Sequence, residues 1–194
     1  MQLSGASLKM GIKMLNYKLK VINLFGPPGC GKSTTAAGLF HKMKVNGYDV
    51  EIVTEFAKDM VWEQQHPDRF SNQIYISSVQ NNKQLHLIAH GVEYCITDSP
   101  VLMSALYTPK NYYSHFLPLL LEIHSSYDNI NFLLDRNFDY VSKGRNKTEL
   151  ESIELGDSIK DFLDANGIIY HHISADFDSV DIIYNIITQN KSYA

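Results

Sequence analysis

The sequence predicts an α/β protein in which a parallel sheet lies between two layers of helices. Five short apolar runs, rich in β-branched residues, alternate with segments of helical spacing along the chain. This alternation is typical of parallel strands joined by helical crossovers. The run at 92–100 is almost entirely apolar, as expected for a strand buried on both faces. A glycine-rich loop joins the first strand directly to a helix. Together these observations predict a three-layer domain.

The expected elements follow one another in a regular order. Ser71 and Gly91 are the predicted start and stop signals of one long helix, and Thr148 and Glu151 have the spacing of a capping box before another. Asn46 and Gly47 end the helix that follows the glycine-rich loop. The predicted strands are 20–25, 48–55, 92–100, 129–136 and 168–174. The predicted helices are 33–45, 56–65, 71–91, a short one ending near 106, 112–126, 149–165 and 178–189.

The glycine-rich loop has a specific spacing. Gly26 is followed by four residues and then by Gly31, Lys32 and Ser33, which is the pattern of a phosphate-binding P-loop. Glycines leave no Cβ in the way, so successive backbone N–H groups turn inward around a phosphate and the helix adds its N-terminal dipole. Lys32 is expected to reach the outer phosphates, and the Ser33 hydroxyl to bind Mg²⁺. The predicted nucleotide-binding residues are Gly26, Pro27, Pro28, Gly29, Cys30, Gly31, Lys32, Ser33 and Thr34.

Length and composition fit one globular domain. The 194 residues are 44% hydrophobic and 20% charged, and a formal net charge of −4 provides no overall basic field for non-specific DNA binding. Cys30 and Cys95 have no disulfide-like spacing, which is typical of a reducing cytoplasm. Lysines interrupt residues 1–18, so we expect neither a signal peptide nor a membrane span there, but an extension with little order in which Met14 is a candidate start. The remaining residues, 19–194, are expected to form the single domain.

Two carboxylates follow predicted strands. Asp98 ends the third strand, where a P-loop protein needs a carboxylate to organise Mg²⁺. Ser99 and Pro100 follow it, in place of the glutamate that activates water in motor and AAA-type ATPases, which disfavours a hydrolytic machine. Glu55 ends the second strand at the edge where open α/β sheets bind ligands. It is a candidate base for an acceptor hydroxyl, with a solvated strand-end glutamate as the alternative interpretation.

A basic segment follows the fourth predicted strand. Two of the three arginines in the chain, Arg136 and Arg145, lie in the polar stretch 135–147 together with Lys143 and Lys147. Such a segment is expected to close over the nucleotide as a lid and to offset charge on the transferred phosphoryl group. A solvated charged loop is the alternative.

These motifs resemble the nucleoside-kinase branch of the P-loop kinases, and in particular bacterial ribosylnicotinamide kinase domains and their phage-borne relatives. The resemblance covers about residues 19–189. It implies the sheet order 2-3-1-4-5, ATP with Mg²⁺ as donor, a small hydroxyl acceptor beside the second strand's carboxylate, and an adenine near the turn from Ala175 onward. The motifs that carry it are the P-loop, "TEFAKDMVWE" at 54–63, "TDSP" at 97–100, "DR" at 135–136, "YVSKGR" at 140–145 and "GIIYHHIS" at 167–174.

We therefore expect a cytoplasmic kinase that uses ATP and Mg²⁺ to phosphorylate a hydroxyl of a small, nucleoside-like acceptor, with no membrane partner. Between the second and third strands the sequence offers few cations besides Arg69, Lys58 and Lys83, which favours a neutral acceptor over a monophosphate. The predicted catalytic residues are Lys32, Glu55, Asp98, Arg136 and Arg145, and the predicted metal ligands are Ser33 and Asp98.

Other interpretations stay open at this point. A phage-type kinase could act on a nucleotide or on a hydroxymethylated base in DNA, with "YTPKNYY" at 107–113 as a contact surface, although packing is the more frequent role of such tyrosines. A P-loop ATPase or a nucleotide-binding regulatory module is the alternative from another class. His86 and His90 stand four residues apart on a predicted helix, but no third metal ligand accompanies them, which favours a structural role.

Overall fold

The computed structural model describes residues 17–139 and 148–189. Five strands alternate with helices along this part of the chain, as predicted. The strands are β1 (Lys20–Phe25), β2 (Val50–Val53), β3 (Tyr94–Thr97), β4 (Asp128–Arg136) and β5 (His171–Ala175). The α-helices are α1 (Lys32–Val45), α2 (Phe56–Trp62), α3 (Gln73–Ala89), α4 (Phe116–Ser125), α5 (Glu149–Ala165) and α6 (Ser179–Gln189). Two 3₁₀ helices are η1 (Pro67–Ser71) and η2 (Val101–Tyr107).

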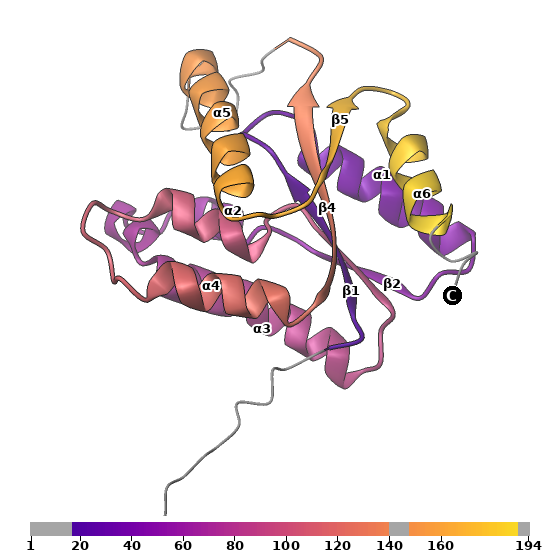
Figure 1. Ribbon diagram of the computed structural model, residues 1–194, viewed down its shortest axis with the longest axis horizontal. Coiled ribbons are helices and arrows are strands. Elements are labelled where there is room, and N and C mark those ends of the chain that lie inside the picture. Colours follow the sequence, from indigo (N-terminus) through magenta and orange to yellow (C-terminus); the bar gives the residue numbers. More distant parts are fainter. Residues whose placement is uncertain (1–16, 140–147, 190–194) are drawn as a thin grey trace, which may run out of the picture.

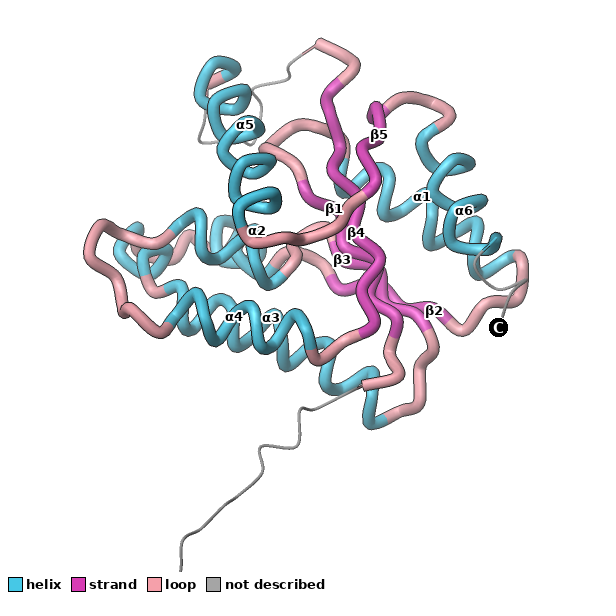
Figure 2. Tube along the Cα trace, viewed as in Figure 1, coloured by secondary structure: helices cyan, strands magenta, loops and turns pink. Residues whose placement is uncertain are grey.

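The five strands form one sheet in the order β2-β3-β1-β4-β5, and every neighbouring pair is parallel. This is the order that the resemblance to P-loop kinases implies, and that expectation is confirmed. β1 occupies the centre, between β3 and β4 (Figures 1 and 2). Because all strands run the same way, the segments that follow their carboxyl ends meet at one edge of the sheet, and this edge holds the P-loop.

Helices cover both faces of the sheet. α1 and α6 pack together on one face, and α3, α4 and α5 lie on the other (Figure 1). The central strand shows why both faces are apolar: Ile22 and Leu24 are buried among the α1 and α6 side chains, whereas Val21 and Phe25 are buried on the opposite face. Alternation along a strand sends successive side chains to opposite faces, so an almost continuous apolar sequence fills both cores.

A polar network lies inside this apolar sheet. The side-chain amide of Asn23 on β1 donates hydrogen bonds to Asn129 Oδ1 (2.8 Å) and Asn131 Oδ1 (3.0 Å) on β4. Asn131 in turn donates to the carbonyl of Ile169 in the segment before β5 (2.9 Å). These side-chain amides therefore have hydrogen-bond partners. They link three neighbouring segments, β1, β4 and the chain before β5, toward the amino ends of the strands.

Three of the predicted helix boundaries are wrong. The helix predicted at 56–65 already ends at Trp62. Ser71 does not cap α3: it closes the 3₁₀ helix η1, and Asn72 caps α3 by accepting a hydrogen bond from the Tyr75 N–H (3.1 Å). The helix predicted at 112–126 begins only at Phe116, and Asn111 in the preceding turn has a positive φ of 64°. The short helix near 106 is the 3₁₀ helix η2.

The capping box before α5 is confirmed. Thr148 Oγ1 accepts from the Glu151 N–H, and the Glu151 carboxylate accepts from the Thr148 N–H. The strands predicted at 48–55 and 92–100 are shorter than expected, since most of their flanking residues that leave the hydrogen-bonded ladder are polar, and the strand predicted at 168–174 is formed over His171–Ala175. Of the predicted extension 1–18, only Tyr17 and Lys18 lie within the described residues. Among the described helices, none combines the length and the apolar character needed to span a membrane.

Candidate active site

The P-loop connects β1 to α1 and adopts positive φ angles at its three glycines. φ is 147° at Gly26, 82° at Gly29 and 93° at Gly31, values that other residues rarely adopt. A Cβ on Gly26 would lie 2.5 Å from Cys30 Sγ and 2.8 Å from the carbonyl oxygen of Leu134. Only glycine therefore lets the loop pass this closely over β4.

The side chain of Lys32 lies against the loop that precedes it. Its Nζ donates hydrogen bonds to the carbonyl oxygens of Gly26 (2.7 Å) and Pro27 (2.9 Å). Lys32 is also the first residue of α1, so its ammonium group adds to the positive end of the helix dipole. The positive charge thus lies within the loop, as a phosphate-binding role requires.

Ser33 and Asp98 meet across the edge of the sheet. The Ser33 hydroxyl donates a 2.6 Å hydrogen bond to Asp98 Oδ2, because β1 and β3 are neighbours and both segments leave the sheet at the same edge. Asp98 is only 6% exposed, and its Oδ1 is buried without a hydrogen-bond partner among the described residues.

This pair fits a magnesium ion. A buried carboxylate oxygen that lacks a donor calls for a ligand, and Mg²⁺ prefers oxygen ligands. The described residues contain no cluster of three or more histidine, cysteine or acidic side chains that could hold a metal. Mg²⁺ is commonly held by only one or two protein oxygens together with water and phosphate, so a hydroxyl and one carboxylate agree with such a site.

Glu55 occupies the N-cap position of α2, directly after β2. Burial raises the pKa of its carboxyl above the usual range, while the positive charge of Lys32 lowers this pKa and the negative charge of Asp98 raises it. The fold therefore brings the predicted residues Lys32, Glu55 and Asp98 within electrostatic reach of one another, from three separate segments. A carboxyl with a raised pKa at such an edge has the properties of a proton acceptor.

The two predicted lid arginines have different outcomes. Arg136 ends β4, is 16% exposed on its side chain, and donates a 2.6 Å hydrogen bond to Glu149 Oε1 at the start of α5. Arg145 lies outside the described residues, as do Lys143 and most of the predicted lid. Its catalytic role stays a prediction.

Two aromatic residues lie at this edge: Tyr107, from the segment 107–113 named above, and Phe138, which sequence reasoning missed. Burial raises the pKa of the Tyr107 hydroxyl to about 12, and the charges of Glu55 and Cys30 contribute to the shift, so the residue is within electrostatic reach of the candidate base; 41% of it is exposed. Phe138 packs beside the P-loop: a Cβ on Gly31 would lie 3.3 Å from Phe138 Cζ. The only signal in the sequence was the position of Phe138 two residues after Arg136.

Beside Glu55, an aromatic pair lies between two cations. The rings of Phe56 and Tyr75 meet edge to face with centroids 5.5 Å apart. Lys83 Nζ lies 5.7 Å from the Phe56 centroid, and the Arg69 guanidinium lies 5.6 Å from that of Tyr75. This cluster from α2, η1 and α3 begins at the residue directly after the candidate base, and we call it the aromatic wall.

Three polar or aromatic residues of this region do not contribute chemistry in the structure. Gln80 is buried and ties α3 to its neighbours: it accepts from the Phe56 N–H (3.3 Å) and donates to Thr97 Oγ1 (3.3 Å). Gln73 donates to the Phe70 carbonyl within the turn before α3 (2.7 Å). Trp62 is 72% exposed at the end of α2.

The histidines also have structural partners. His171 stacks on Phe132 with centroids 5.3 Å apart, and His172 Nε2 lies 2.6 Å from Asp135 Oδ2, so the two neighbours point to opposite faces of the sheet. His86 and His90 belong to no metal-binding cluster among the described residues.

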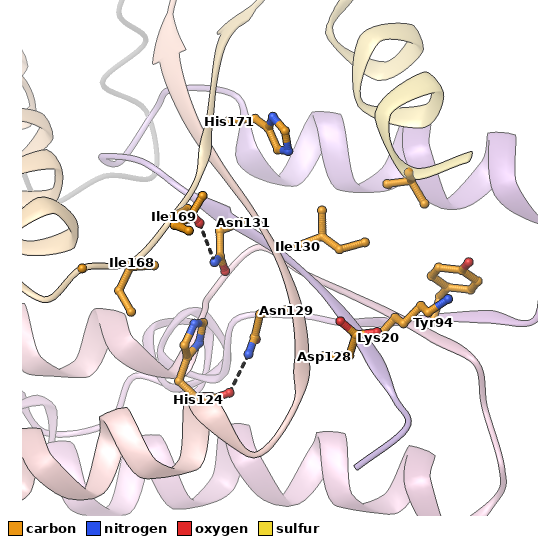
Figure 3. A pocket seen from close by; sticks show the side chains of 12 residues that line it. Lys20, Tyr94, His124, Asp128, Asn129, Ile130, Asn131, Ile168, Ile169 and His171 are labelled. Carbon is orange, nitrogen blue, oxygen red and sulfur yellow. Dashed lines mark hydrogen bonds between the residues drawn. The ribbon is translucent and has the colours of Figure 1, made fainter. Parts of the chain in front are cut away.

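A cavity lies at the other end of the sheet (Figure 3). It has a volume of about 580 Å³ and includes Lys20, Tyr94 and Asp128, the first residues of their strands. Asn129 and Asn131 line it too, but their amides donate to the carbonyls of His124 and Ile169. No P-loop residue borders this cavity, so it is separate from the candidate active site.

Comparison with known proteins places the chain in a family. Residues 21–179, most of the chain, match a family described as an AAA domain (AAA_28). The chain belongs to this family. No curated protein matches the sequence.

Two solved structures show which P-loop proteins share this fold. The chain is similar to a structure of the NadR protein in complex with NR, with a TM-score of 0.67 and 13% identity over 87% of this chain and 51% of that one. It therefore spans about half the length of that protein. It is also similar to thymidylate kinase from Ehrlichia chaffeensis, with a TM-score of 0.57 and 14% identity over 89% and 98% of the two chains. The fold is that of the P-loop nucleotide kinases, which confirms the resemblance at the level of structure.

Proposed function

We propose that this protein is a phosphotransferase that moves the γ-phosphate of ATP, with Mg²⁺, to a hydroxyl of a small, nucleoside-like acceptor. One observation carries the proposal: the half-buried carboxyl of Glu55, directly after β2, is within electrostatic reach of Lys32 and Asp98 at the edge that also holds the P-loop. Ser99 and Pro100 follow Asp98, where a hydrolytic ATPase has the glutamate that activates water. Glu55 is therefore the candidate base at this edge, and it lies on the acceptor side. The shared fold with P-loop kinases supports the same class.

The donor side follows from the P-loop. Its backbone N–H groups and the Lys32 ammonium would bind the phosphates and offset their charge. Ser33 and Asp98 would hold Mg²⁺, which when bound offsets further charge on the phosphates. Phe138 beside Gly31 and Ala175 supplies a ring next to the turn where the resemblance puts the adenine.

The proposed step is a direct transfer. The acceptor hydroxyl oxygen forms a bond to the γ-phosphorus while the bond from this phosphorus to the β,γ-bridging oxygen breaks. The hydroxyl proton goes to the Glu55 carboxylate, and ADP leaves with the bridging oxygen. Arg136 and Arg145 complete the proposal as groups that offset charge on the transferred phosphoryl group.

The aromatic wall supports a neutral, ring-bearing acceptor. Phe56 and Tyr75 offer ring surface against which a planar base can pack. Of the two cations beside them, Lys83 donates to the Thr54 carbonyl and pairs with Asp59, whereas Arg69 lies over the Tyr75 ring. Among these described residues an acceptor phosphate would therefore have to rely on Arg69, which favours a neutral acceptor. Both cysteines are buried and outside disulfides, in keeping with the cytoplasmic location that belongs to this proposal.

The test is ADP release with and without an acceptor. Purified protein is incubated with ATP and Mg²⁺ alone, and then with nucleosides, nucleoside monophosphates and single-stranded oligonucleotides, while mass spectrometry follows phosphorylation of each acceptor. We expect slow turnover alone and a sharp increase with a nucleoside. Stimulation by oligonucleotides alone would identify a polynucleotide kinase. Fast hydrolysis that ignores every acceptor and persists in Glu55→Gln would identify an ATPase.

A further inference from the structure

Helix α5 contacts the P-loop through two residues that are one turn apart. Ser152 is 3% exposed, and its hydroxyl donates a 2.8 Å hydrogen bond to the carbonyl oxygen of Pro28, 124 residues away in the chain. Gly156 lies under the neighbouring proline: a Cβ built on it would be 3.4 Å from Pro27 Cγ and 3.7 Å from Cδ. The two P-loop prolines therefore rest on one face of α5.

The Ser152 bond is not an ordinary helix bond. Ser158 on the same helix donates to the carbonyl of Glu154 one turn earlier, which is the usual arrangement for a helical serine. Ser152 instead satisfies a carbonyl of the P-loop. A loop that turns its N–H groups toward a phosphate must turn carbonyls away from it, and each such buried carbonyl needs a donor.

The carbonyls of the P-loop are held from two directions. Lys32 donates hydrogen bonds to the carbonyls of Gly26 and Pro27, and Ser152 donates one to the carbonyl of Pro28. If Lys32 turns toward bound phosphates, its bonds to the Gly26 and Pro27 carbonyls are lost. The bond from Ser152 on α5 to the Pro28 carbonyl then remains. The first residue of α5, Glu149, also pairs with Arg136 at the end of β4. A single helix thus touches both the loop and an arginine that we assign to the donor side.

We propose that α5 is a positioning element of the donor site, in which Ser152 and Gly156 fix the P-loop in its phosphate-binding shape. The inference rests on the proposed function only in taking the P-loop as the phosphate site. The two residues touch the loop and not the substrate, so they act through the conformation of the loop.

Binding of inorganic tripolyphosphate with Mg²⁺, measured by calorimetry, tests this without turnover. We expect Ser152→Ala to weaken binding of tripolyphosphate and of ATP by about 5- to 10-fold, as for loss of one hydrogen bond. Ser158→Ala, the same substitution on the same helix, should bind both as the wild type does. In turnover, Ser152→Ala should raise the KM for ATP and leave the KM for the acceptor unchanged, a split that general destabilisation would not produce.

Gly156 provides a second pair of variants. Gly156→Ala places its Cβ in ordinary contact with Pro27 and favours the helix, so binding should be retained and the melting temperature should not fall. Gly156→Leu also favours the helix but displaces Pro27, and should weaken tripolyphosphate binding. Wild-type affinity for tripolyphosphate in both Ser152→Ala and Gly156→Leu would overturn the inference. Failure of the proposed function appears elsewhere, as an absence of acceptor phosphorylation by the wild type.

Discussion

The donor side of the candidate site is made mainly of backbone, whereas the acceptor side is made of side chains. On the donor side, three glycines shape the loop, and Lys32 and Ser152 hold its carbonyls. On the acceptor side, Glu55 and the aromatic wall come from segments that are joined only by tertiary packing. The comparison teaches that residues close together in the sequence determine phosphate binding. The choice of acceptor depends instead on how α2, η1 and α3 pack together. Substitutions on the two sides should therefore have separable effects.

The largest effect is expected at Lys32. Lys32→Ala should abolish phosphoryl transfer, because backbone N–H groups alone do not replace a positive charge that follows the phosphates through the transition state. Transfer to the acceptor is measured by mass spectrometry, with Lys44→Ala at the other end of α1 as control. Turnover within a few-fold of the wild type would contradict the assignment of the donor side.

Glu55→Gln should keep ATP affinity and lower kcat by about 10²- to 10⁴-fold, as for loss of a general base. Because burial raises the pKa of Glu55, the wild-type kcat should fall as the pH drops through a pKa above that of an ordinary glutamic acid, and this acid limb should be absent in the variant. The exposed Glu122→Gln serves as control. Loss of ATP affinity with unchanged kcat would move Glu55 to the donor side.

The same carboxyl has an effect on stability. A raised pKa means that the folded state binds the proton more tightly than the unfolded chain, so its contribution to stability is present at low pH and is lost as the pH rises through the folded pKa. The neutral amide of Glu55→Gln should thus raise the melting temperature at neutral pH, and the difference should disappear in acid.

Asp98→Asn should act first through the metal; it also removes a negative charge that raises the pKa of Glu55. The variant can retain a hydrogen bond with Ser33 but loses the negative charge, so the Mg²⁺ concentration for half-maximal activity should rise by about 10- to 100-fold. A magnesium titration of ADP release measures this, with Asp128→Asn at the far end of β4 as control. An unchanged magnesium requirement would remove Asp98 from the proposed metal site.

The smallest effects sharpen the comparison most. Phe138→Ala should weaken ATP binding by about 10-fold and leave tripolyphosphate binding unchanged, since a ring stacks on a base and not on phosphate. Tyr75→Ala should raise the KM for the acceptor by a similar factor and leave ATP binding unchanged. Calorimetry and steady-state kinetics separate the two. If either variant changed both ligands equally, the two sides would not be independent.

The features that could be predicted are those determined by residues close together in the sequence. The P-loop spacing and the Thr148–Glu151 capping box are local, and the structure has both. Ser71 was a wrong cap because the next residue, Asn72, offers an equally suitable side chain, and only the packing of η1 decides between them.

The missed residues depend on distant contacts. Ser152 reaches a carbonyl 124 positions away, and no periodicity in α5 distinguishes it from Ser158. Phe138 meets Gly31 only because β1 and β4 are neighbours in the sheet. Lys32, Glu55 and Asp98 could each be named from their positions after strands, but the raised pKa of Glu55 arises from burial, which the sequence does not contain.

The three asparagines of β1 and β4 also constrain how the chain finds its fold. Asn23 pairs with Asn131 in the ladder, and the two positions are 108 residues apart, so no turn dictates how these strands align. A slip of one residue would turn Asn23 to the opposite, apolar face and leave buried amides unpaired, at a cost of roughly 1–3 kcal/mol for each group. The buried amide hydrogen bonds therefore specify the register of β1 against β4, because a misaligned sheet would lose them. An Asn23→Leu chain would bury more apolar surface, but a shifted register would no longer leave a buried Asn23 amide unpaired. The native register would then be favoured less strongly over misaligned ones.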